Sequence, residues 1–267
     1  MKKLGKAFKS GILALLYIGI YYAVTYAVRS VYVLWQESLG KVSGSEIVLS
    51  ARNNTYALGV IAMIITFWVY LVIINKRNFS IDYISEKKKN PAVIYAMAVC
   101  LAIGMRLIVS VYFSYSQGVE VLKKSIDDAA TFTPELSSST QIIIALFSIV
   151  VITPLFEEFL FRGLIMHEFM TTVRPWLAIL LQAVLFGLAH GVLFQSLFTF
   201  VIGILLGIVY YRTQNLKTVA LCHGAFNVSV ILAQEELTLI TGAMVAVMGL
   251  VLVIFSMSYI LMHCKRK

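Results

Sequence analysis

Residues 154–164, PLFEEFLFRGL, place Glu157, Glu158 and Arg162 inside an apolar run that extends over residues 140–166. The run is long enough for a membrane helix, which needs about 20 predominantly apolar residues. A charged side chain at the centre of such a helix costs about 2.5–3.5 kcal/mol on insertion scales. Charges in this position therefore indicate a packed ion pair or a reactive site.

The composition of the whole chain is that of an integral membrane protein. Of its 267 residues, 60% are hydrophobic and 13% are charged, and the mean hydropathy is +0.88. Soluble domains are about 45–50% apolar and about 25% charged. The apolar runs follow one another along the chain, which predicts one integral membrane domain over residues 1–267, without a separate soluble domain.

Eight apolar runs are candidates for membrane helices. They cover residues 11–35, 54–75, 91–115, 140–166, 176–192, 194–213, 217–234 and 239–262. The sequence therefore predicts an all-α fold, a polytopic transmembrane helical bundle of about eight membrane helices.

The net charge of +9 does not indicate nucleic-acid binding, because the basic residues gather at the ends of apolar runs. They open the chain, recur in the loop at 76–90 and close the chain in CKRK, whereas the loop at 116–139 is mainly acidic. This positive-inside pattern predicts that both termini are cytoplasmic and that the lipid bilayer is the main partner. The three cysteines show no C-x-x-C spacing, which argues against a disulfide or a cysteine metal site.

The two adjacent glutamates are expected to differ in their partners. Glu158 and Arg162 are four residues apart, so they share a helix face and can pair. Glu157 points about 100° away and has no local partner. The pattern fits a buried Glu–Arg pair that joins helices, and it equally fits a reactive carboxylate beside a neutralised one.

Two further polar motifs lie on other predicted helices. FGLAHG contains Phe186 and His190, and CHGAFN contains His223 and Asn227, each pair four residues apart on one face. Either motif alone fits side chains that hydrogen-bond between packed helices. Together with Glu157, however, two imidazoles form a set that activates water. The carboxylate takes the proton, while the imidazoles bind a metal or donate to the oxyanion.

Other residues near these motifs have simpler interpretations. HEFM is not a zincin motif, because position 171 is a threonine, and His167 and Glu168 are expected at the cytoplasmic interface. Two G-x-x-x-G pairs predict close helix contacts. They are Gly187 with Gly191 and Gly203 with Gly207.

The motifs E-E-x-x-x-R, F-x-x-x-H and H-x-x-x-N occur in this order and resemble those of the CPBP family of intramembrane proteases. This is also called the CAAX protease and bacteriocin-processing, or Abi, family, and it includes the eukaryotic type II CAAX prenyl endopeptidases. The resemblance covers residues 140–234, which would form the catalytic core. The first 115 residues resemble the family only as hydrophobic helices.

The resemblance implies an intramembrane endopeptidase that hydrolyses a peptide bond in a membrane-associated protein or peptide. By motif position, the water-activating base would be Glu157. The residues that bind a metal or stabilise the oxyanion would be His190, His223 and Asn227. The supporting residues would be Glu158, Arg162 and Phe186. Zinc held by His190 and His223 is compatible with this set, and so is a glutamate that activates water unaided.

Two other functions fit the same residues. One is a proton-coupled transporter that uses Glu157 and the histidines as a relay, although the sequence shows no inverted repeat. The other is a non-catalytic bacteriocin-immunity membrane protein, a role linked to some members of the family. The compact chain without long termini is expected in a bacterial plasma membrane, as a multi-pass protein.

Overall fold

The structure, a computed structural model, describes residues 2–40, 44–77, 91–131, 133–232 and 237–264, and every regular element in these ranges is helical. The elements are α1 (Lys2–Ser38), α2 (Gly44–Asn53), α3 (Thr55–Lys76), α4 (Pro91–Ser116), α5 (Glu120–Thr131), α6 (Ser139–Phe147), η2 (Ser148–Ile152), α7 (Thr153–Glu158), η3 (Phe159–Ile165), α8 (Met166–Met170), α9 (Pro175–Ala189), α10 (Leu193–Thr213), α11 (Leu216–Leu232) and α12 (Leu239–His263). The predicted all-α fold is confirmed. Most of the basic loop at 76–90 and of the CKRK tail lies outside the described residues.

Six of the described helices are long and apolar enough to cross a membrane. They are Gly5–Ser38, Thr55–Lys76, Ala92–Ser116, Ser139–Met170, Leu193–Thr213 and Leu239–His263. Two shorter apolar helices, Pro175–Ala189 and Leu216–Ile231, correspond to the other two predicted runs. The protein is thus a multi-pass helical bundle, whereas the count of eight spans and the cytoplasmic termini stay predictions.

The helix α9 ends earlier than the predicted run at 176–192, and the reason is Gly191. This residue has φ +70°, a left-handed conformation that suits glycine, and it makes the turn into α10. The predicted helix contact at Gly191 is therefore wrong, since no atom would lie within 4 Å of its Cβ. Gly187 does make the predicted close contact, because its Cβ would lie 2.8 Å from the carbonyl oxygen of Ser196.

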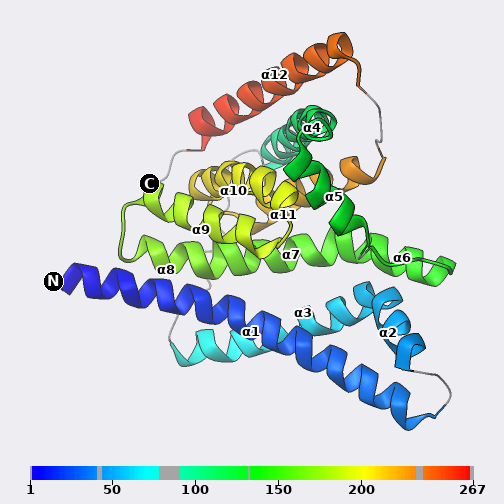
Figure 1. Cartoon of the computed structure of the whole chain (residues 1–267). Coiled ribbons are helices and arrows are strands. Elements are labelled where there is room, and N and C mark those ends of the chain that lie inside the picture. The colour runs from blue at the N-terminus through cyan, green and yellow to red at the C-terminus, as the bar shows by residue number, and fades with distance from the viewer. Residues whose placement is uncertain (1, 41–43, 78–90, 132, 233–236, 265–267) are drawn as a thin grey trace.

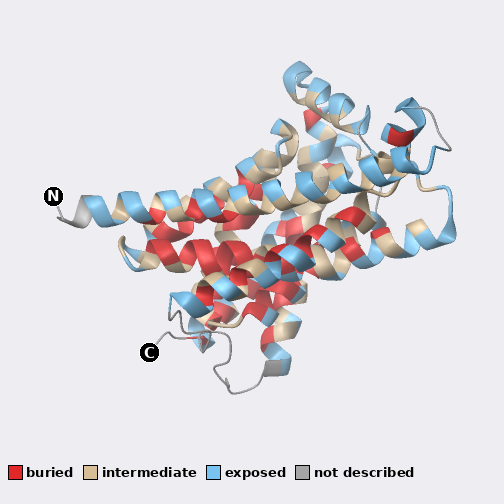
Figure 2. Ribbon diagram, turned by 90° about the horizontal axis from the view of Figure 1, so that it is seen from below, coloured by how far each residue is buried: buried red, intermediate tan, exposed pale blue. Residues whose placement is uncertain are grey.

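The central feature of the bundle is a helical rod made of α6, η2, α7, η3 and α8, which run end to end (Figure 1). Helices α1 and α3 lie on one side of the rod, and α9, α10 and α11 lie on the other. Helix α4 packs on α11, and α12 packs on α4 at the outside of the bundle. Buried residues concentrate along the rod and its neighbours (Figure 2). The first motif is therefore in the best-shielded part of the molecule.

The outermost helix, α12, is attached through a contact between two glycines. A Cβ on Gly249 would lie 3.0 Å from the carbonyl oxygen of Gly104 in α4, and a Cβ on Gly104 would lie 2.9 Å from that of Gly249. Small residues let membrane helices approach this closely and gain van der Waals contact. The predicted contact at Gly203 is of the same kind, because its Cβ would lie 3.1 Å from Ala183 of α9.

We expect Gly249→Ala to lower the thermal unfolding temperature of the protein in detergent. The added methyl group meets the backbone of α4, and overpacking of this kind costs about 1–3 kcal/mol. Gly242→Ala is the matched control in α12, because the nearest atom to its Cβ would be at an ordinary 3.8 Å. Equal unfolding temperatures for the two variants would contradict the close crossing.

Candidate active site

The rod that carries the first motif is not a regular α-helix. Two π-helical turns, η2 and η3, flank the short segment α7. The N–H of Thr153 donates one π-turn back, to the carbonyl of Ser148, and Pro154 has no N–H. The carbonyl of Ile149 is therefore without these two backbone donors, although a buried carbonyl needs a partner.

Asn227 of α11 supplies a donor to this carbonyl. Its Nδ2 donates to the oxygen of Ile149 at 2.8 Å. Helix α11 comes this close because Gly224 has no side chain, and a Cβ there would lie 2.6 Å from the carbonyl oxygen of Val150. The third motif thus docks on the irregular turn before the two glutamates, and this docking carries His223 toward them.

Glu158 and Arg162 form the predicted ion pair. Arg162 Nη1 donates to Glu158 Oε1 at 2.8 Å, and both residues are 0% exposed. The guanidinium also lies over Phe186, 4.5 Å from the ring centroid, and its Nη2 donates to the carbonyl of Gly203 at 3.3 Å. Removing one partner of a buried pair costs about 3–5 kcal/mol, because the other charge is left unpaired. The pair therefore ties the rod to α9 and α10.

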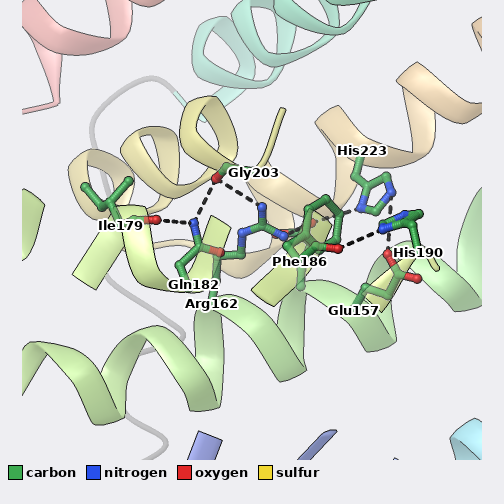
Figure 3. Close-up of polar contacts among 9 residues, drawn as sticks. Glu157, Arg162, Ile179, Gln182, Phe186, His190, Gly203 and His223 are labelled. Carbon is green, nitrogen blue, oxygen red and sulfur yellow. Dashed lines mark hydrogen bonds and ion pairs between the residues drawn. The ribbon is translucent and has the colours of Figure 1, made fainter. Parts of the chain in front are cut away.

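His223 connects this ion pair to the second glutamate. Its Nδ1 lies 2.9 Å from Glu158 Oε1, and because an ionised carboxylate only accepts, Nδ1 is the donor. The other ring nitrogen, Nε2, lies 3.8 Å from Glu157 Oε2 (Figure 3). Phe186 packs edge-on against the imidazole, with ring centroids 5.9 Å apart. The free nitrogen of His223 is thereby held toward Glu157.

Glu157 is the carboxylate that stays available. Its side chain is 24% exposed, and its buried Oε2 has no hydrogen-bond partner among the described residues. It lines a cavity of about 170 Å³ together with His190 of α9 and with Tyr21 and Tyr22 of α1. A single water needs about 10–15 Å³ of such space, so the cavity has room for a water and for another group beside it.

His190 reaches this cavity from the end of α9. Its Nδ1 lies 2.8 Å from the carbonyl oxygen of Phe186, which only accepts, so Nδ1 donates and Nε2 is left free. The hydroxyl of Tyr22 donates at 2.8 Å to the carbonyl of Ala189, one of the last carbonyls of the helix, which lack an intrahelical partner. Helix α1 thus fixes the end of α9 from which His190 projects.

The structure brings together three of the four residues that the sequence selects for the reaction. Glu157 and His190 line one cavity, and His223 faces Glu157. Asn227 is also expected there, but the cavity is not lined by it, and its amide is used on the carbonyl of Ile149. The chemical roles of all four residues stay predictions.

Sequence reasoning missed the part that the N-terminal helices play. Tyr21 and Tyr22 lie within the apolar run at 11–35, and two adjacent hydroxyl groups inside such a run are a polar signal in the sequence. Gly224 was missed as well, although it lies next to His223 in the third motif. A glycine beside a motif residue indicates close approach of another helix.

A second buried ionic cluster contains Glu168. This residue is only 5% exposed and forms an ion pair with Arg77 at the end of α3, while its predicted position at the cytoplasmic interface stays a prediction. The hydroxyl of Tyr17 accepts from Arg77 at 2.6 Å and donates to Glu168 at 3.3 Å. The cluster joins α1, α3 and α8, and so it holds α1 against the rod.

The histidines adopt the tautomers that metal-binding imidazoles adopt, with Nδ1–H bound to a carboxylate or carbonyl and Nε2 free. However, no three His, Cys, Asp or Glu side chains within the described part of the chain are grouped closely enough to hold one ion. The residues therefore do not fit a three-ligand zinc site in this arrangement. Zinc binding by His190 and His223 stays a prediction, and no step below depends on it.

Residues 139–229 match the family model of type II CAAX prenyl endopeptidase Rce1-like proteins. The match covers about a third of the chain and includes all three motifs. It confirms the family resemblance that the motifs indicate. No curated protein and no solved structure gives a significant match to the chain.

We expect Asn227→Ala to destabilise the protein by about 1–3 kcal/mol, the usual cost of a buried carbonyl that loses its donor. Pro154→Ala restores a backbone N–H to the rod, so Asn227→Ala should cost less in that background than in the wild type. Unfolding of the wild type, the two single variants and the double variant in detergent gives the coupling energy. Strictly additive effects would show that Asn227 does not replace the missing N–H.

Proposed function

We propose that this chain, whose motif-bearing segment resembles the CPBP family, is an intramembrane endopeptidase in which Glu157 activates water. The observation that carries the proposal is the contrast between the two adjacent carboxylates. Glu158 is bound by Arg162 and His223, whereas Glu157 forms no hydrogen bond with the described residues and lines the cavity beside His190. A carboxylate that lacks a hydrogen-bond partner is costly in a membrane helix, which favours a chemical role.

Glu157 lies where a general base is needed. A water in the cavity donates a hydrogen bond to the Glu157 carboxylate, and Glu157 takes its proton as the water oxygen attacks the carbonyl carbon of the scissile peptide bond. The carboxylic acid formed in this way then gives the proton to the leaving amine nitrogen as the C–N bond breaks. Glu157 is thus ionised again after each turnover. The apolar walls lower the local dielectric constant and strengthen these interactions.

The two histidines contribute through their Nε2 atoms, because each Nδ1 is already engaged. In the neutral ring Nε2 accepts a hydrogen bond and orients the attacking water. In the protonated ring it donates to the negative charge that develops on the carbonyl oxygen. Glu158 and Arg162 support this arrangement because Glu158 accepts from His223 Nδ1 and is itself held by Arg162, so neither residue touches the reacting atoms.

The substrate that we infer is a membrane-associated protein or peptide in a bacterial plasma membrane. The cavity walls support this class, because apart from the polar groups described above they consist of apolar side chains. These are Ile18, Phe156, Leu160, Phe161 and Ala189. An extended segment that leaves the bilayer can present its peptide bond to Glu157 without first crossing bulk water.

We expect Glu157→Gln to fold and insert normally but to cleave peptides about 10²–10⁴ times more slowly, which is the usual worth of general acid–base catalysis. Glutamine keeps the size of the side chain but cannot take a proton from water. The measurement is peptide cleavage by the purified protein in detergent or lipid.

Two control variants sharpen this test. Glu135→Gln changes a carboxylate whose side chain is 81% exposed, and it should cleave at the wild-type rate. Glu158→Gln should lose stability as well as cleavage rate, because the Glu158 carboxylate neutralises the buried charge of Arg162. A Glu157→Gln protein that cleaves like the wild type would remove Glu157 from the mechanism and leave the transporter and immunity alternatives standing.

We expect a metal chelator to leave peptide cleavage by the wild-type protein unchanged, since the described side chains form no three-ligand centre. The measurement is the cleavage rate after dialysis against chelator and after addition of zinc. Activity that is lost on chelation and regained with zinc would assign the free Nε2 atoms of His190 and His223 to a metal and overturn the unaided mechanism.

A further inference from the structure

Gln182 is a buried polar residue of α9 that belongs to none of the three motifs. It is 0% exposed in a helix whose other described residues are almost all apolar. Its Nε2 donates to the carbonyl of Gly203 at 2.8 Å and to that of Ile179 at 2.9 Å. A buried amide costs free energy unless it is hydrogen-bonded, so Gln182 needs hydrogen-bond partners on the neighbouring helices.

The bundle makes room for this amide through a glycine. A Cβ on Gly207 of α10 would lie 2.7 Å from Gln182 Nε2, so only glycine leaves the space that the amide occupies. One turn away on α10, the carbonyl of Gly203 accepts from two side chains, namely Gln182 Nε2 and Arg162 Nη2. Gln182 and the motif arginine therefore meet at one backbone oxygen (Figure 3).

The remaining polar atoms of these two side chains are complementary. Gln182 Oε1 is a buried acceptor and Arg162 Nε is a buried donor, and neither has a hydrogen-bond partner among the described residues. An unpaired buried group of either kind costs about 1–3 kcal/mol, and more when the group is charged. A free acceptor and a free donor on two side chains that share one carbonyl can satisfy each other, directly or through one bridging water.

We propose that Gln182 is a positioning residue of the candidate active site, which acts through Arg162 and Glu158 on His223. The amide fixes the Gly203 carbonyl, this carbonyl accepts from the guanidinium, and the guanidinium holds Glu158. Glu158 in turn holds the Nδ1–H of His223, so that Nε2 faces Glu157. This role rests on the proposed peptidase function, but the chain of contacts that it describes exists independently of any substrate.

The test is Gln182→Met, which keeps the length and shape of the side chain but removes both polar atoms. Gln195→Met, in the first turn of α10 and outside this cluster, is the matched control. ¹⁵N-histidine-labelled proteins in detergent report the tautomer of His223 by NMR, and cleavage of a peptide gives kcat and KM for the folded fraction.

We expect the wild type and Gln195→Met to show His223 as the Nδ1–H tautomer alone. In Gln182→Met the Nε2–H tautomer should also be populated, and kcat should fall by about 10–100-fold with KM unchanged, the usual size of effects from groups that orient a reactive residue. A Gln182→Met protein with an unchanged tautomer or an unchanged kcat overturns the proposal, whatever its effect on unfolding temperature.

A measurement on the wild type keeps the proposal testable if Gln182→Met does not fold. An experimental structure in lipid should place Gln182 Oε1 within direct or one-water hydrogen-bond reach of Arg162 Nε, and an Oε1 turned elsewhere overturns the proposal. The tautomer of His223 and the position of Gln182 Oε1 are both measured without substrate. A wild type that shows the expected tautomer but cleaves no peptide therefore overturns the proposed function and leaves the contact chain from Gln182 to His223 standing.

Discussion

The buried ion pair between Glu158 and Arg162 is the constraint on which the rest of the site depends. Neither side chain reaches solvent, so every remaining polar need must be met by the protein. Three neighbouring helices supply contacts to the pair, namely the ring of Phe186 from α9, the carbonyl of Gly203 from α10 and the imidazole of His223 from α11, while Glu158 Oε2 and Arg162 Nε have no hydrogen-bond partner among the described residues. The cost of burying one charge pair thereby sets the packing of three helices around the rod.

Irregular backbone around α7 gives the same region its geometry. A π-turn adds one residue to a helical turn and rotates the side chains that follow by about 100°. With such turns on both sides of α7, the rod exposes the carbonyl of Ile149 to Asn227, and Gly224 lets α11 approach the rod. The proline and the glycine act at the same junction. Pro154 removes a backbone donor, and Gly224 lets α11 approach, so that the side chain of Asn227 replaces that donor.

The candidate site also extends beyond the segment that carries the family motifs. Helix α1 lies outside residues 139–229, yet its tyrosines form part of the cavity beside Glu157 and His190. The buried cluster of Tyr17, Arg77 and Glu168 holds this helix in place.

The sequence by itself determined the features that depend on local spacing and on the solvent. Hydropathy indicated membrane helices, and the four-residue spacing of Glu158 and Arg162 placed them on one helix face, where they can pair, and placed Glu157 on another. Tertiary structure alone decided which distant groups meet them. His223 lies 65 residues from Glu158, and its approach depends on the π-turns and on the small glycines that set distances between helices. Helix packing also decided that Asn227 donates to a backbone carbonyl, that Glu168 is buried and that Tyr22 donates to the carbonyl of Ala189. Helical periodicity specifies which face a residue occupies, but the partner of that face is fixed only when the helices pack.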